Sequence, residues 1–228
     1  MHPHLQRITH VHLNAIANAP ERFEAQFVNL TELPNLPKNA AALERGRQFH
    51  QVMQQHFLGL DVSPLLDADA DLDRYFQAYR TSPPELLDGD RQAERALTSA
   101  CGGFQLYGVL DLLVEGGDRA QIVDWKTYRH PPTVEHLRRH WQTRLYLYLL
   151  ADNFEGDRAA LSMTYWFAEA PEHSVVIPYS QADYDRDRAD IQHLLDRLQQ
   201  WLPDRFPTQA IAPTPALAVE TMPELPLP

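Results

Sequence analysis

Two aspartates and one lysine stand in a part of the chain that otherwise has the composition of buried β-strands. Asp111 interrupts one apolar run, Asp124 and Lys126 flank Trp125 at the end of the next, and a polar turn at 115–120 separates the two runs. If the runs pair as a hairpin, the three charged side chains meet at neighbouring strand ends. The two carboxylates could then hold Mg²⁺ or Mn²⁺ beside a phosphodiester, while the ammonium stabilises negative charge that develops on it.

A structural explanation of the same residues has to be weighed against this chemistry. Strict alternation would place Asp111 on one strand face with Val109 and Leu113, where an unpaired carboxylate is costly. Asp124 follows an apolar run and faces the same cost, and Lys126 lies on its side at i+2. A partly buried ion pair between Asp124 and Lys126 is the alternative. It leaves one acid unexplained, so we favour the metal site.

Length and composition favour one globular domain. The 228 residues are 44% hydrophobic and 10% aromatic, which is enough for one sizeable core. We expect a helical part at about 1–85, a catalytic core at about 86–202 and a proline-rich tail at about 203–228. No apolar run of about 18 residues and no charged-then-apolar leader occurs, so we expect a cytoplasmic protein without a membrane span.

Hydrophobic periodicity predicts an α/β arrangement. The expected helices are 41–58, opened by Asn39 after the helix-breaking Pro34 and Pro37, 65–80, 134–150 and 181–202. The expected strands are 91–100, 104–115 and 120–127, which form an antiparallel meander, and 161–168 and 174–179, which form a further hairpin. The segment 5–16 fits a short strand or a helix equally well.

Charge and cysteine content limit the partners. The net charge of −11 excludes a chain that holds polyanions by bulk attraction, so a nucleic acid must be held locally. Cys101 stands alone and cannot form an internal disulfide, a four-cysteine zinc site or an iron–sulfur cluster. No GxxxxGK[ST] segment occurs, which excludes an ATP motor of that type within this polypeptide.

Two further motifs flank the charged triplet in the sequence. Gly46-Arg47-Gln48-Phe49-His50 lies in the expected helix upstream, and Gln142-Thr143-Arg144-Leu145-Tyr146 lies in the helix downstream. With Asp111 and Asp124-Trp125-Lys126 between them, the four elements resemble the PD-(D/E)XK nuclease superfamily, and specifically its RecB-like branch. Order and spacing agree across about residues 40–150.

The resemblance implies a restriction-endonuclease-like α/β core, with a central mixed sheet flanked by helices. It implies a stand-alone Mg²⁺- or Mn²⁺-dependent deoxyribonuclease, an exonuclease acting in DNA repair, recombination or defence, with DNA as partner and a helicase or other repair or defence protein in trans. The implied metal ligands are His50, Asp111 and Asp124. The implied catalytic residues are Asp111, Asp124, Lys126, Gln142 and Tyr146.

Each role has an alternative when the residue is considered alone. A helix histidine such as His50 is ordinarily solvated or hydrogen-bonded, and His56 has no counterpart in the family. Gln142 and Tyr146, one turn apart, would orient Lys126 or the substrate, or form a polar helix edge. Glu94 is a candidate additional acid near the metal. For the whole chain, the alternative is a catalytically silent domain that binds nucleic acid or a repair partner.

The chain has two further charged stretches, one basic and one acidic. A basic strip could follow a nucleic-acid backbone or be a solvated helix face; it comprises Arg129, His130, His136, Arg138, Arg139, His140 and Arg144. The acidic run 67–73 lacks the glycine and the closing Glu of a calcium-binding hand, so we expect a solvated helix start there.

Overall fold

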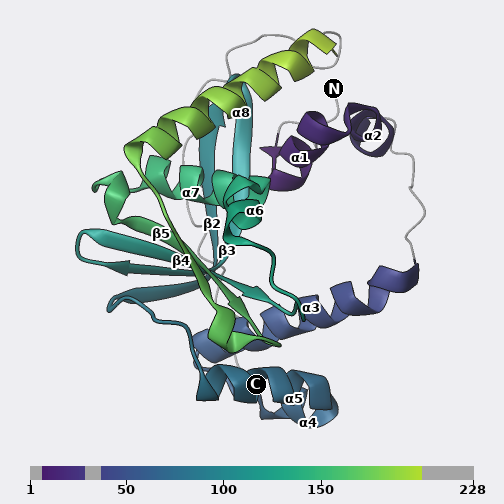
Figure 1. Ribbon diagram of the computed structural model, residues 1–228, viewed down its shortest axis with the longest axis vertical. Helices are drawn as coiled ribbons and strands as arrows, with labels where there is room; N and C mark the ends of the chain where they lie inside the picture. The colour runs from purple at the N-terminus through teal and green to yellow at the C-terminus, as the bar shows by residue number, and fades with distance from the viewer. Residues whose placement is uncertain (1–6, 29–36, 202–228) are drawn as a thin grey trace, which may run out of the picture.

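The computed structural model describes residues 7–28 and 37–201, which fold into a mixed sheet between two layers of helices (Figure 1). The six strands are β1 (Arg7–Ile8), β2 (Asp90–Cys101), β3 (Phe104–Gly116), β4 (Arg119–Lys126), β5 (Leu161–Phe167) and β6 (Val175–Pro178). Their order is β1-β3-β4-β5-β6, and β2 also pairs with β3. The antiparallel meander β2-β3-β4 and the hairpin β5-β6 are confirmed, and β4 runs parallel to β5.

The helices cover both faces of this sheet. On one side lie α1 (His10–Asn18), α6 (Val134–Arg139), α7 (Trp141–Asn153) and α8 (Gln181–Trp201) (Figure 1). On the other lie α3 (Pro37–Phe57), α4 (Ser63–Ala68) and α5 (Ala70–Thr81). Short elements connect them: α2 (Pro20–Phe23), the π-helical η2 (Glu24–Val28), η3 (Arg158–Ala160) and η4 (Pro171–His173). In the described residues, no helix is long and apolar enough to cross a membrane.

Each face of the sheet has its own apolar core. The α7 side buries Leu106, Leu110 and Leu113 of β3 against the helices. The α3 side buries an aromatic cluster that includes Phe49, Trp125 and Trp166. Because α3 and α7 pack on opposite faces of the sheet, side chains from the two helices can meet only at the end of a strand or where two neighbouring strands separate.

Two expected helices are each broken by a side chain that caps a new helix. The expected helix 65–80 is two helices, α4 and α5, which are separated at Asp69. The Asp69 side chain caps α5 by accepting hydrogen bonds from the backbone N–H groups of Asp71 and Leu72. The expected helix 134–150 is likewise two helices, because His140 Nδ1 accepts from the Gln142 N–H and opens α7. The continuous helices are therefore wrong predictions.

The N-terminal part differs from expectation in a second way. The segment that fitted a strand or a helix equally well contains both, because β1 pairs parallel to β3 and α1 follows it. The helix expected from 41 begins at Pro37, where proline is tolerated because a first helical residue needs no N–H acceptor. The proline-rich tail at 203–228 lies outside the described residues, and the division at about 85 and 202 stays a prediction.

The close approach of β3 to α7 depends on Gly108. A Cβ there would lie 2.9 Å from Tyr146 Cε1 and 3.0 Å from Leu149 Cδ1. Overpacking of this kind costs about 1–3 kcal/mol, so we expect Gly108→Ala to lower the free energy of unfolding by that amount in urea titrations. Gly46→Ala is the matched control. Its Cβ would meet only Thr127 Oγ1 at an ordinary 3.5 Å, so within α3 it should be neutral or stabilising. Equal stabilities for the two variants would contradict this packing.

Candidate active site

The predicted site lies where β3 and β4 part. β4 pairs with β3 only over Leu112–Gly116, and β1 pairs only with Gln105 and Leu106. Among the described strands, none pairs with residues 107–111 on that side of β3. Asp111 stands at this fork, and its Oδ2 accepts the Trp125 N–H at 2.9 Å. The carboxylate thus takes the place of a backbone acceptor at the point where the β-ladder stops.

Strand alternation slips at Asp111. Leu110 and Leu113 are three residues apart yet both belong to the core on the α7 side, so the prediction that Asp111 shares a face with Leu113 is wrong. On the partner strand, Glu94 is skipped by the register and has a φ of 52°, a left-handed conformation that costs about 1–3 kcal/mol for a residue with a side chain. Val109, Asp111 and Glu94 all line the cavity beside α3, so the alternation of β3 holds through Asp111 and slips just after it.

α3 brings His50 to the same place. Its neighbours Phe49, Val52 and Met53 are fully buried and anchor the helix on the sheet. His50 Nδ1 then lies 3.2 Å from Asp111 Oδ1. His50, Glu94 and Asp111 each offer a ligand atom, and these atoms all lie within 4.8 Å of one another.

The other half of the site comes from β4 and α7. Lys126 Nζ lies 2.5 Å from Asp124 Oδ2 and donates to Gln142 Oε1 at 3.1 Å. Gln142 also donates through Nε2 to Asp124 Oδ1 at 2.6 Å. Asp124 and Lys126 do lie on the same side of the strand, as i+2 spacing predicted. One amide therefore holds both members of the ion pair in position.

Tyr146 lies one turn after Gln142 and is buried against Gly108. Burial, together with the charges of Asp124 and Asp111, raises the pKa of its phenol. His10 at the start of α1 packs edge-on against this ring, with centroids 5.6 Å apart, and burial lowers the pKa of His10 to about 4. No sequence pattern pointed to His10, because no local feature links this segment to α7.

Burial and neighbouring carboxylates shift the pKa values of the ionisable groups at the fork. Burial and the neighbouring Asp111 raise the pKa of Glu94, and burial raises the pKa of Asp124 even though Lys126 opposes it. Burial alone would lower the pKa of His50, but the hydrogen bond and charge of Asp111 raise it to about 9. The shifts of Glu94 and Asp124 thus come chiefly from burial, and that of His50 from the adjacent carboxylate.

The donor set fits a hard divalent metal. Carboxylate oxygens with one imidazole nitrogen suit Mg²⁺ and Mn²⁺. Asp124, only 1% exposed, keeps an Oδ2 atom that makes no well-aligned hydrogen bond despite the adjacent ammonium. The three potential ligands that lie closest together are nevertheless His50, Asp111 and Glu94, whereas the family resemblance implied Asp124 as the third ligand. The ligand role of Asp124 stays a prediction.

Arg144, one member of the expected basic strip, is mostly buried and does not form part of an exposed basic surface. Its guanidinium lies 4.2 Å from the Trp141 ring centroid, and its Nε donates to the buried Asp187 at 2.7 Å. Arg144 therefore ties α7 to α8 and does not face a substrate. Within the strip, Arg139 pairs with Glu135 in its own helix.

In the acidic run 67–73, Asp69 caps α5 and Asp71 pairs with Arg45 and Arg74, in line with the expected helix start.

A cavity of about 750 Å³ opens beside the charged cluster. α3 forms one wall with Leu43 and His50, and the opposite wall carries Asp111, Lys126 and Tyr128. This volume lies within the usual range for small-molecule sites, so one nucleotide unit can enter beside the carboxylates.

Comparison with known proteins identifies the fold and the family of the chain. Among solved structures, the chain is similar to a "Putative exonuclease" from Eubacterium rectale, with 9% identity, a TM-score of 0.57, and coverage of 97% of this chain and 91% of that chain. So low an identity shows the fold alone. SSO0001 is 13% identical over 84% of this chain and 76% of that chain, with a TM-score of 0.41. No curated protein matches the sequence. A family model described as the PD-(D/E)XK nuclease superfamily matches residues 7–213, and the chain belongs to this superfamily.

Proposed function

We propose that the protein is a metal-dependent deoxyribonuclease that hydrolyses phosphodiester bonds at the fork between β3 and β4. The observation that carries the proposal is the convergence of His50, Glu94 and Asp111 from three elements, beside the Asp124–Lys126 pair. The family membership supports the same chemistry. An exonuclease in DNA repair, recombination or defence, the RecB-like branch, a partner protein in trans and a cytoplasmic location stay predictions.

The side chains divide the work. His50, Asp111 and Glu94 or Asp124 would hold Mg²⁺ or Mn²⁺, which when bound polarises a phosphodiester and lowers the pKa of water. Lys126 has its ammonium fixed by Asp124 and Gln142, so it can stabilise negative charge on the phosphate without reorganising. Gln142 holds the Asp124 carboxylate and the Lys126 ammonium in position. Tyr146, one turn later in α7, packs against Gly108 of β3.

The rival is a silent domain that binds nucleic acid or a repair partner. Every residue named by the motif is present, and the charged ones are held at contact distance, which favours catalysis. The test is degradation of linear single- and double-stranded DNA with Mg²⁺, with Mn²⁺ and with EDTA, compared with Asp124→Ala and Lys126→Ala. Folded wild-type protein without cleavage in either metal, or cleavage that both substitutions leave unchanged, would eliminate the enzymatic proposal.

Glu94 gives a separate prediction, because its strain and its charge can be removed independently. We expect Glu94→Gln and Glu94→Gly both to weaken Mn²⁺ binding about tenfold or more, since each loses a carboxylate at the cation site. Glu94→Gly should also be more stable than Glu94→Gln, with a free energy of unfolding higher by about 1 kcal/mol, because glycine adopts a positive φ without strain. Calorimetric Mn²⁺ titrations and urea curves check both effects. Unchanged Mn²⁺ affinity in Glu94→Gln would remove Glu94 from the ligand set.

A further inference from the structure

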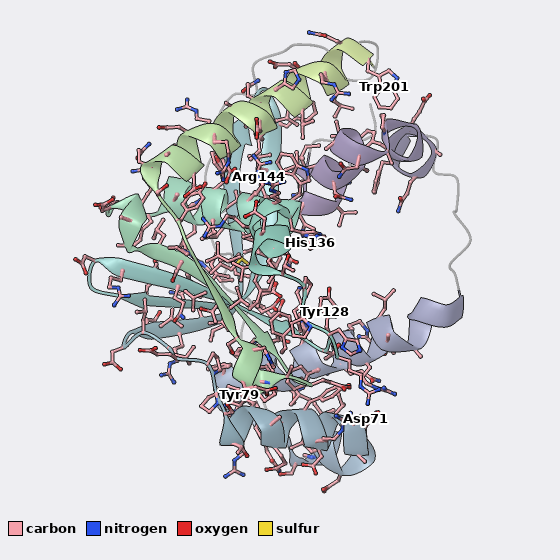
Figure 2. All side chains as sticks on the ribbon, in the orientation of Figure 1. Asp71, Tyr79, Tyr128, His136, Arg144 and Trp201 are labelled. Atoms are coloured by element: carbon pink, nitrogen blue, oxygen red, sulfur yellow. The ribbon has the colours of Figure 1, made fainter. Side chains whose placement is uncertain are left out.

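Tyr128 is an exposed aromatic residue at the wall of the active-site cavity. It lies two residues after Lys126 and is 47% exposed. Figure 2 labels it between α6 and α3. Its ring contacts Phe167, with centroids 6.4 Å apart and a tilt of 36°. The ring is thus supported by a fully buried phenylalanine, while much of its surface faces solvent.

Leu43 contributes a second apolar surface to the same cavity from α3. It is 72% exposed, the most exposed of the large hydrophobic side chains in the described residues. A single exposed leucine needs no explanation. Leu43 and Tyr128, however, come from segments far apart in sequence and border one cavity that also contains the proposed metal ligands.

The charges of the cavity show that electrostatics alone would hold a nucleic acid weakly. Its basic side chains, Arg47, His50 and Lys126, are each paired with a carboxylate. Glu94 and Asp111 line the same space, and the chain carries a net charge of −11. A divalent metal held by these carboxylates would attract the phosphate at one point, so the rest of a strand that enters this cavity must gain affinity from other contacts.

We propose that Tyr128 and Leu43 hold an unpaired nucleobase next to the phosphate at the metal centre, so that the site takes single-stranded DNA. This inference rests on the proposed nuclease function. A base within a duplex has both faces stacked on its neighbours, whereas an unpaired base can stack on a tyrosine ring. Such stacking gives about 1–3 kcal/mol per base, which corresponds to about 5- to 150-fold in affinity.

The test measures binding of a fluorescent single-stranded DNA oligonucleotide in Ca²⁺, so that no cleavage is required. We expect Tyr128→Ala to weaken binding about 5- to 150-fold and Tyr128→Phe, which keeps the ring, to retain most of the affinity. Leu43→Ala should weaken binding, while Leu58→Ala should not. Leu58 is a matched control because it follows α3, is 58% exposed and does not line the cavity. The wild type should bind the corresponding duplex more weakly than the single strand.

Oligonucleotides with one abasic position, moved stepwise along the strand, identify the stacked base. One position should weaken binding to the wild type and have little further effect in Tyr128→Ala, because the same contact is already lost. Equal binding by wild type and Tyr128→Ala, equal loss in Tyr128→Phe and Tyr128→Ala, or no binding of single-stranded DNA by folded wild type would overturn the inference. Absence of cleavage with normal binding would instead count against the nuclease proposal alone.

Discussion

Asp111→Asn is expected to abolish phosphodiester cleavage while leaving the protein folded. The asparagine oxygen can still accept the Trp125 N–H that closes the fork, but the ligand charge beside His50 is lost. A bound metal contributes several kcal/mol of charge stabilisation in the transition state, so the rate should fall about 10³-fold or more. Single-turnover cleavage in saturating Mn²⁺ measures this loss.

Asp111→Ala separates chemistry from folding. It removes the charge and also the acceptor, which leaves a buried N–H of Trp125 without its partner. The unfolding free energy should then fall by about 1–3 kcal/mol relative to Asp111→Asn, although both variants are inactive. If Asp111→Asn keeps the wild-type rate, the fork carries no catalytic metal. If both variants are equally stable, the Trp125 hydrogen bond does not hold the fork together.

Lys126→Met is expected to lower both activity and stability. Loss of a preorganised positive charge at a developing anion costs about 10²- to 10³-fold in rate. The substitution also leaves Asp124 buried without its partner, and breaking a buried pair in this way costs about 3–5 kcal/mol. Single-turnover rates and urea unfolding curves measure the two effects.

The double variant Lys126→Met with Asp124→Asn is the control. The neutral asparagine can still accept from Gln142 Nε2, so stability should recover while activity stays lost. Recovery of activity in the double variant, or a wild-type rate in Lys126→Met, would contradict the role given to the ammonium.

The parts of the fold that depend on short-range pattern could be predicted from sequence. The meander followed from β-rich runs separated by glycine turns, and the placement of Asp124 and Lys126 on one side of the strand followed from i+2 spacing. The ion pair between them is the alternative to which the metal site was preferred, and the structure contains it. The meeting of His50 with Asp111 required more than periodicity. It was inferred from the order of motifs, and the structure brings the two side chains into contact.

The parts that depend on distant contacts could not be predicted in this way. The alternation slip at Asp111 and the positive φ of Glu94 belong to a pair of strands and not to either sequence alone. Arg144 was counted in the basic strip because no sequence pattern links it to its partner Asp187, which is 43 residues away. His140 looked like a helix interior residue, since capping by a histidine ring has no strong sequence signature.

Anomalous diffraction from a crystal soaked in manganese shows which residues bind the metal. We expect one principal Mn²⁺ peak at the fork, bound by His50 and Asp111 with Glu94 or Asp124 completing the protein ligands. The peak should disappear in Asp111→Asn crystals grown in the same way. A principal manganese ion bound elsewhere, or a fork without manganese in a crystal of folded protein at saturating concentration, would contradict a metal site at the fork.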